Sequence, residues 1–225
     1  MLREQIRAMT VNYRVADRHP PLPQDLVDLL SSVETATIGH VEHLGFVGDG
    51  VRPVFPARAA GQALTVAAPG RDGSIIYRAI DLLLPGDMLV ISRVDRDDIA
   101  CVGGGVAVAA KAKGAAGIVI DGPCTDVAEI IETGLPVWCQ GVSSRTTNRS
   151  LRIGGSLNVP VACGAAAILA GYAVLADNEG VFATDRESMR EFAKMAISRQ
   201  ERSARLRSHL AAGRSIFDFD MERPE

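Results

Sequence analysis

From about residue 60 to residue 142, the chain alternates short apolar runs with longer stretches of helical composition. The apolar runs have the length of strands and are bounded by Gly, Pro or Asp: GQALTVAA, DMLVISRV, GIVIDG and PVWCQGV. Between them lie three stretches with the composition of helices: SIIYRAIDLL, GGGVAVAAKAKG and DVAEIIETG. Strands that alternate with helices in this way predict an α/β domain.

Two further apolar runs, VPVACGAA and YAVLADNEGVFAT, continue the predicted strands toward the C-terminus. Ahead of the strands, PPLPQDLVDLLSSVETATIGHVEHLG has Leu and Val at helical spacing and predicts two short helices, stopped by Gly45. After the strands, Thr184 and Glu187 form a capping box before a long helix. We therefore expect an N-terminal helical arm over residues 1–34, a catalytic-type α/β domain over 35–186 and a C-terminal helical tail over 187–225.

The predicted tail helix, RESMREFAKMAISRQERSARLRSHLAAG, is rich in charge. It has too few apolar positions to lie wholly in one core. Two interpretations stay open. The helix docks on another subunit, or it is a solvated helix on the surface of its own domain.

The composition suits a folded domain with a sizeable core, since 47% of the 225 residues are apolar and 23% are charged. The net charge is −3 and Lys and Arg are scattered, which argues against binding to nucleic acid or to an anionic membrane. The 4 cysteines form no CxxC pair, and no apolar run is long enough for a targeting or membrane-spanning segment. We expect reduced thiols in a cytoplasm and a small-molecule or protein partner.

Three consecutive glycines, Gly103 to Gly105, precede the helical stretch that continues from Val106. The first N–H groups of a helix have no intrahelical partner and lie at the positive end of its dipole, so they can hold a carboxylate. A tight connection between a strand and a helix would use the same residue type. The sequence leaves both interpretations open.

Asp126 and Glu129 lie three residues apart at the start of the next predicted helix, directly after the strand GIVID. Ligands of α/β sheets bind at such strand ends, although the two acids could simply compensate the dipole of their own helix. A glycine loop that binds a carboxylate and an acid that holds a divalent ion would together bind a 2-oxo acid. Carboxylate and water ligands favour Mg²⁺ or Mn²⁺, which acts as a Lewis acid on a keto oxygen.

Several segments carry a resemblance to a known family: TATIGHVEHLG, DGVRPVFPARAAGQALTV, AIDLLLPGDMLVI, GGGVAVAAKAKGAAGIVIDGPCTDVAEI, LPVWCQGVSSR, LNVPV and NEGVFATDRE. From about Thr35 to Glu187 the chain resembles the 4-hydroxy-4-methyl-2-oxoglutarate aldolases, a superfamily that also contains regulator of ribonuclease activity A. The resemblance implies an α/β sandwich of the swivelling β/β/α type. It also implies a homotrimer or homohexamer with sites at subunit interfaces.

The signature positions of that family fall on Gly103, Gly104, Thr125, Asp126 and Glu129. The resemblance implies that Asp126 binds the metal and that the backbone from Gly104 to Val106 holds the carboxylate of pyruvate. Thr125 stands where the family has a substrate-binding arginine, and Gly104 stands where it has an acid that orders metal-bound water. A threonine offers one neutral hydroxyl, whereas a guanidinium offers five donors and a fixed charge.

Five arginines are candidates for the missing positive charge: Arg145, Arg149 and Arg152 in the loop SSRTTNRSLR, and Arg93 and Arg96 after LVIS. Each could instead be an ordinary solvated or ion-paired arginine.

Two other features near the signature are candidates for chemistry. His40 and His43 lie three apart on a predicted helix, a spacing that can bind a metal or pass protons, but no further ligand is evident. Cys124 is either a reactive thiol at a helix N-terminus or a buried apolar residue, and we favour the second.

The residues and the resemblance together predict a divalent-metal-dependent lyase, of aldolase or decarboxylase type, that acts on a 2-oxo acid or a related carboxylate. Asp126 would anchor Mg²⁺ or Mn²⁺ through water, and Thr125 would donate a hydrogen bond. The carboxylate would bind to the amides of four residues, Gly103, Gly104, Gly105 and Val106. The alternative is a non-catalytic scaffold that binds a protein partner, as the ribonuclease regulator does, because a fold alone does not separate the two.

Overall fold

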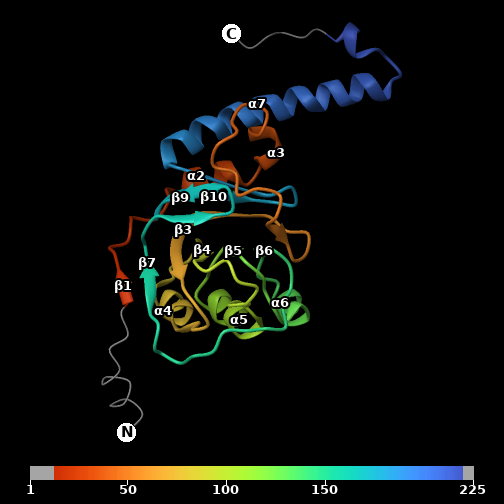
Figure 1. Ribbon diagram of the computed structural model, residues 1–225. Coiled ribbons are helices and arrows are strands. Elements are labelled where there is room, and N and C mark those ends of the chain that lie inside the picture. The colour runs from red at the N-terminus through yellow and green to blue at the C-terminus, as the bar shows by residue number, and fades with distance from the viewer. Residues whose placement is uncertain (1–12, 220–225) are drawn as a thin grey trace.

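Four parallel strands form the centre of the protein, in a computed structural model that describes residues 13–219 (Figure 1). In sheet order they are β3 (Ala59–Ala68), β4 (Asp87–Arg93), β5 (Gly117–Asp121) and β6 (Val137–Cys139). The connections between successive strands contain α4 (Ser74–Leu82), α5 (Gly104–Ala112) and α6 (Val127–Thr133). The predicted α/β fold is therefore confirmed.

Every residue of β4 is buried, because both faces of the sheet are covered. Leu89 and Ile91 contact α4, α5 and α6 in one apolar cluster, whereas Met88 and Val90 belong to a second cluster on the opposite face. Strands that are buried on both sides have continuous apolar runs instead of alternating ones. This explains why the central strands could be located from the sequence.

Two hairpins supply the residues that cover the second face of the sheet. One pairs β8 (Val161–Cys163) with β9 (Ala166–Ile168), and the other pairs β10 (Ala173–Ala176) with β11 (Val181–Thr184). β10 also runs antiparallel to the first half of β3. The layers thus follow the β/β/α order expected for the fold, and the predicted run YAVLADNEGVFAT forms a hairpin.

Three short strands extend the edges of the sheet and were not predicted. β7 (Gly155–Leu157) pairs with the second half of β3, and β1 (Tyr13–Val15) pairs with β7. At the other edge β2 (Arg52–Pro53) pairs with β6. The arm expected over residues 1–34 therefore contributes a strand as well as a helix, and residues 1–12 lie outside the described part of the chain.

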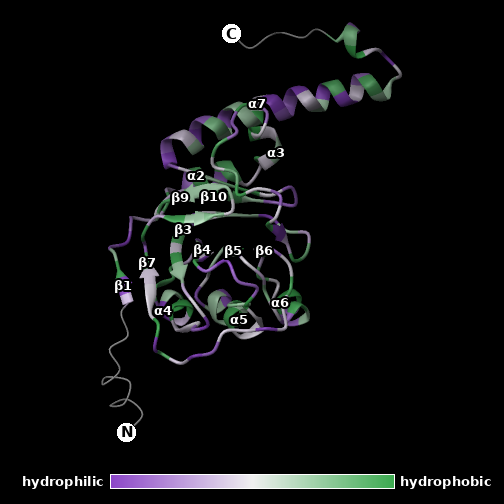
Figure 2. Cartoon of the chain, viewed as in Figure 1, coloured by the Kyte–Doolittle hydropathy of each residue, from purple (hydrophilic) through white to green (hydrophobic). Residues whose placement is uncertain are grey.

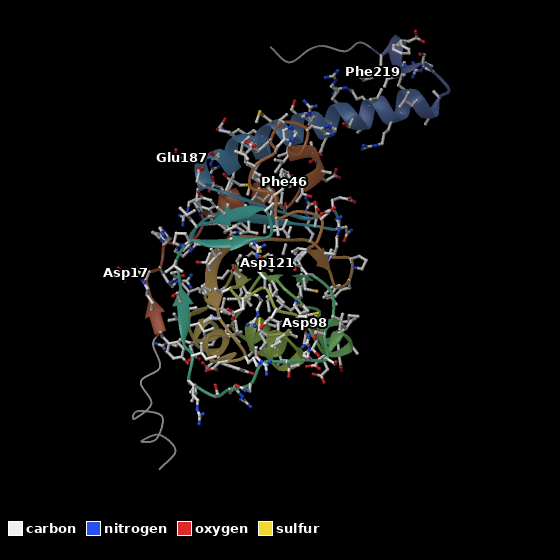
Figure 3. All side chains as sticks on the ribbon, in the orientation of Figure 1. Asp17, Phe46, Asp98, Asp121, Glu187 and Phe219 are labelled. Atoms are coloured by element: carbon white, nitrogen blue, oxygen red, sulfur yellow. The ribbon has the colours of Figure 1, made fainter. Side chains whose placement is uncertain are left out.

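The long helix α7 (Arg186–Ala211) packs its apolar residues on the body in its first half, and Gln200 just beyond the middle still hydrogen-bonds Ser32 and Glu34. Met189, Ala193 and Ala196 contact α2 (Gln24–Leu30) and Ile38 of α3 (Thr35–Ile38). The second half projects beyond the body and is mixed in hydropathy (Figures 1 and 2). At its far end His209 contacts Phe219, whereas Phe46 lies below the part of the helix that packs on the body (Figure 3). A 3₁₀ helix of one turn, η1 (Ile216–Asp218), follows α7.

Two local predictions in this region are wrong. The N-cap of α7 is Asp185 and not Thr184, since the Asp185 carboxylate accepts hydrogen bonds from the backbone N–H groups of Glu187 and Ser188. An aspartate and a threonine are both good caps, so adjacent candidates are hard to separate by sequence. His40 does not lie in a helix, because α3 ends at Ile38.

Within the described part of the chain, no helix is both long and apolar enough to cross a membrane.

Candidate active site

The loops that follow β4 and β5 meet at one edge of the sheet. Because the two strands are parallel, their C-terminal ends lie side by side. Beyond the strands the chains stay paired: Val102 bridges Cys124, and the N–H of Thr125 donates to the carbonyl of Val102 at 2.9 Å. This pairing brings Gly103 of one loop against the Thr125–Asp126 segment of the other, so the two halves of the predicted site come together.

Asp126 directs its carboxylate to the N-terminus of α5 and not to that of its own helix. It is the N-cap residue of α6 but makes no side-chain capping bond there. Instead, its Oδ2 accepts the N–H of Gly104 at 3.2 Å, and the Thr125 hydroxyl lies 3.4 Å from its Oδ1. The acid therefore faces the positive end of the neighbouring dipole. It makes no capping hydrogen bond to its own helix α6.

The backbone of Asp126 adopts the left-handed conformation, with φ 53° and ψ 45°. Aspartate tolerates this region better than most residues, at a typical strain of about 1 kcal/mol. Strain of this kind persists where the surrounding structure enforces it. Here the turn aims the carboxylate across the loop to α5, which a regular helix start would not do.

Close contacts with side chains of the second loop explain two of the glycines. A Cβ on Gly103 would lie 2.8 Å from Thr125 Cγ2 and even closer to Asp126 Oδ2. A Cβ on Gly104 would lie 2.7 Å from the Cβ of Glu129 and would overlap its carboxylate. The Glu129 side chain thus takes the space in which an acid at position 104 would stand. The tight connection is therefore observed, and binding of a carboxylate by the N–H groups beyond it stays a prediction.

A pocket of about 180 Å³ opens at this edge. Of the predicted site residues, Gly103, Gly105, Val106, Thr125 and Asp126 line it. Gly104 is buried beneath, and Glu129 lies outside on the exposed face of α6. The N–H groups of Gly105 and Val106 belong to the first turn of α5, where no preceding carbonyl can accept them within the helix.

Six residues of this pocket were not predicted. Three carry hydroxyls, Tyr77 from α4 and Thr146 and Thr147 from the loop after β6, and the others are Ala100, Cys101 and Val102. That loop runs along the strand ends, because Ala100 bridges Thr146. The pocket therefore presents four hydroxyls, those of Tyr77, Thr146, Thr147 and Thr125. Sequence spacing could not predict that these hydroxyls meet, because they come from α4, from the loop after β5 and from the loop after β6.

The five candidate arginines have different environments. Arg93 is buried and binds Asp97 at 2.8 Å and the carbonyl of Gly70 at 2.6 Å. Arg145 forms an ion pair with Asp98, which is labelled in Figure 3. Arg149 lies over the ring of Tyr77, with 5.3 Å between Cζ and the ring centroid.

The remaining two candidates are not directed to the pocket by any described contact. The backbone N–H of Arg152 donates to Asp72, and Arg96 occupies a left-handed turn after β4.

Cys124 is fully buried, as favoured from the sequence, and its thiol lies 3.4 Å from that of Cys139. The hydrogen bond between the two thiols lowers the pKa of Cys139 below that of an ordinary thiol. The same contact, together with burial, raises the pKa of Cys124. The pair lies behind the pocket wall and not in it, so the thiols support the wall and do not face a ligand.

In the two largest of the described cavities, a charged lining residue is hydrogen-bonded within the protein. The first, of about 400 Å³, is lined by Arg186, which donates to Gln62 and to the carbonyl of Gly171. The second, of about 550 Å³, is lined by Asp177, whose carboxylate accepts from Thr35 and from the N–H of Glu179. The smaller pocket differs from both in its place, at the C-terminal ends of the parallel strands β4 and β5, where the predicted site residues meet.

The donor set at this pocket fits a hydrated hard cation. Asp126 and Glu129 both approach the Gly103–Gly104 segment, and Mg²⁺ commonly binds proteins through one or two carboxylates and keeps several waters. Among residues 13–219, no three His, Cys, Asp or Glu side chains gather as a metal site. A zinc cage built from such side chains is therefore not formed in that range, and His40 and His43 are not part of one.

Comparisons with known proteins agree with this fold. A "Putative 4-hydroxy-4-methyl-2-oxoglutarate aldolase" of Halalkalibacterium halodurans is 32% identical over 125 residues, or 55% of this chain. The match spans only 58% of that relative's length.

Solved structures extend the likeness over most of the chain. Streptomyces coelicolor RraAS2, an unusual member of the RNase ES inhibitor RraA protein family, is 25% identical, with a TM-score of 0.73 over 85% of this chain and 98% of its own. An uncharacterized protein from Pseudomonas syringae pv. tomato has a TM-score of 0.75 at 21% identity, over 88% of this chain and 97% of its own, and shows the fold alone.

A family model described as "RraA-like: Aldolase/RraA" matches residues 24–183, which include the whole pocket and most of the sheet. This match covers more than half of the chain. The protein therefore belongs to the RraA-like (Aldolase/RraA) family.

Proposed function

We propose that the protein is a divalent-metal-dependent lyase, of aldolase or decarboxylase type, that acts on a 2-oxo acid or a related carboxylate. One observation carries the proposal: the exposed carboxylate of Asp126 and the first-turn N–H groups of Gly105 and Val106 line the same small pocket. A group that binds a cation and a group that binds an anion are thus adjacent. Membership of the Aldolase/RraA family supports this reading.

Substrate binding is assigned to the start of α5. The N–H groups of Gly105 and Val106 and the helix dipole would hold the carboxylate of the substrate. Gly104 was expected to bind the substrate carboxylate through its N–H, but that N–H already donates to Asp126. Its role is to hold the Asp126 carboxylate in place, next to the bound anion.

Asp126, with Glu129 as a second carboxylate, would hold Mg²⁺ or Mn²⁺. The ion would supply Lewis-acid polarisation of the keto oxygen. The hydrogen bond from Gly104 leaves the remaining lone pairs of the Asp126 carboxylate available. The left-handed backbone at Asp126 fixes the direction of that carboxylate before any ligand arrives.

Thr125 contributes a neutral hydroxyl beside Asp126. The loss of one preorganised donor to a developing negative charge typically costs about 3 to 4 kcal/mol, or roughly 10² to 10³ in rate. We therefore expect slow turnover of the substrates of the named aldolase relative, unless another cation reaches the pocket. Thr125→Arg should raise the rate of decarboxylation if the pocket is otherwise competent.

The test is release of pyruvate from oxaloacetate and from 4-hydroxy-4-methyl-2-oxoglutarate, with Mg²⁺, with Mn²⁺ and with a chelator. Asp126→Asn keeps the shape of the side chain and should abolish metal-dependent release. Glu132→Gln is the matched control, since Glu132 is an exposed acid on the same helix and lies outside the pocket. Absence of release from both substrates with either metal would rule out this assignment.

A non-catalytic scaffold that binds a protein partner is the second candidate. It is favoured by the likeness to RraAS2 and by the neutral residue at position 125. This candidate predicts no turnover of 2-oxo acids by the wild type and no gain from Thr125→Arg. It also predicts that Asp126→Asn leaves partner binding unchanged, whereas the lyase proposal predicts a metal-dependent reaction.

We also propose a homotrimer or homohexamer. The projecting half of α7 and the exposed Leu210, Ile216 and Phe217 near its end support contact with another subunit. Light scattering coupled to size-exclusion chromatography measures the mass directly. A monomer at micromolar concentration would contradict this proposal.

A further inference from the structure

The pocket needs a positive charge that its lining residues do not supply. Its side chains contribute hydroxyls and the negative carboxylate of Asp126, with Glu129 close by. The helix N–H groups offer only partial charge. The divalent ion of the proposed function would offset these carboxylates when bound, and a cation at the rim would add the positive charge that binds the carboxylate of the substrate.

The candidate cations can be separated by their partners. Arg93 is buried against Asp97 and backbone carbonyls, and Arg145 forms an ion pair with Asp98. Arg149 has no ion pair with any residue from 13 to 219. Instead its guanidinium lies over Tyr77, a ring that itself lines the pocket.

The loop that carries Arg149 is anchored on both sides of it. The N–H of Gly73 donates to the carbonyl of Asn148 and the N–H of Asn148 donates to the carbonyl of Arg71, both at 2.8 Å. On the other side, Asp72 accepts the N–H of Arg152 at 2.7 Å. These bonds tie the loop to the segment that begins α4. The base of the Arg149 side chain is therefore fixed next to Tyr77, whose helix α4 follows directly.

We propose that Arg149 is the substrate-binding cation of this pocket, held at the rim by stacking on Tyr77. The inference rests on the proposed function, because it names the charge that binds the anion at that same site. A guanidinium can stack on an aromatic ring and still present its edge N–H groups to a carboxylate. Arg149 thus supplies from a different loop the positive charge that the neutral Thr125 does not.

Oxalate, a small dianion that is not turned over, serves as the probe in titration calorimetry with Mn²⁺ present. Arg149→Ala should weaken oxalate binding roughly 10- to 100-fold, since it removes hydrogen bonds to a charged group. Arg149→Lys should recover part of the affinity through its charge. Arg145→Ala is the matched control in the same loop, and its affinity should stay within about twofold of the wild type because Arg145 pairs with Asp98.

Tyr77→Leu tests the stacking contact separately. It should lower the affinity for oxalate several-fold while Arg149 is still present, and thermal unfolding of each variant checks that the fold is intact. Oxalate affinity of Arg149→Ala within twofold of the wild type would overturn the inference, as would a wild type that does not bind millimolar oxalate.

The two proposals can fail separately. If the Arg149→Ala variant releases pyruvate in a metal-dependent reaction with an unchanged KM, the lyase proposal is supported and the role of Arg149 is contradicted. If oxalate binding depends on Arg149 but neither 2-oxo acid is turned over, the role of Arg149 in binding is supported and the lyase proposal is contradicted.

Discussion

Replacing the buried Asp72 should loosen the loop that lines the pocket. Its Oδ2 accepts the N–H groups of Arg152 at 2.7 Å and Ile153 at 3.1 Å, and its Oδ1 accepts that of Ser74 at 3.0 Å. In Asp72→Asn one oxygen becomes an NH₂ group, so at least one buried N–H faces a donor. A hydrogen bond to a charged group contributes about 1.5 to 3 kcal/mol. We expect the free energy of unfolding to fall by roughly 2 to 4 kcal/mol.

The same carboxylate predicts a pH dependence. Burial alone would raise the pKa of Asp72, but the N–H groups of Arg152, Ile153 and Ser74 outweigh it and lower the pKa from 3.8 to about 2. A folded state with the lower pKa binds fewer protons than the unfolded chain. The stabilisation is therefore complete above pH 3.8 and is lost as the pH falls toward 2. A shift of this size corresponds to about 2 kcal/mol.

Urea unfolding of wild type and Asp72→Asn at a series of pH values measures both effects. The control is Asp98→Asn, because Asp98 forms an ion pair in which both side chains are 64% exposed. Such surface pairs contribute about 0 to 1 kcal/mol, so this variant should unfold almost like the wild type. Two results would refute the reasoning: a loss at pH 7 no larger than that of Asp98→Asn, or a difference from the wild type that does not shrink between about pH 4 and pH 2.

Three further outcomes are expected. Gly104→Ala should lower the free energy of unfolding by roughly 1 to 3 kcal/mol in urea, because its methyl would lie 2.7 Å from Glu129 Cβ, and a neutral effect would contradict the close approach. The ultraviolet thiolate absorbance should begin to rise below the ordinary thiol pKa of 9.0, and this early rise should be lost in Cys139→Ser; a rise only around pH 9.0 would argue against the hydrogen bond between Cys139 and Cys124. Trp138→Phe removes the 2.8 Å bond from Nε1 to the carbonyl of Asp177 and should lose roughly 1 to 3 kcal/mol by thermal unfolding, whereas an unchanged Tm would argue against that bond.

The central strands could be predicted because a strand that is buried on both faces of the sheet needs a continuous run of apolar residues. The runs around Leu89 and Val119 are examples, and a glycine follows the ends of α5 and α6, at Gly114 and Gly134. β1, β2 and β7 have no such signal, since each is only two or three residues long. They form because a free sheet edge is available, which depends on where the chain returns in space.

Half of the pocket could also be predicted. Gly103 and Asp126 belong to consecutive strand-to-helix loops, and parallel strands bring such loops together whatever their length. The direction of the Asp126 carboxylate could not be predicted, because it depends on a left-handed turn at that residue. Tyr77 and Arg149 could not be associated with the pocket either, since their contact joins α4 to a loop more than sixty residues later in the chain.

The sequence by itself determined the α/β class, the order of the central strands and helices, and the positions of the glycines and acids. These properties depend on local composition and on the geometry of parallel strands. Only the tertiary structure decided which helix the Asp126 carboxylate faces, that Glu129 takes the space above Gly104, and which arginine lies over Tyr77. Those choices depend on side-chain direction and on contacts between distant segments, which spacing along a chain does not encode.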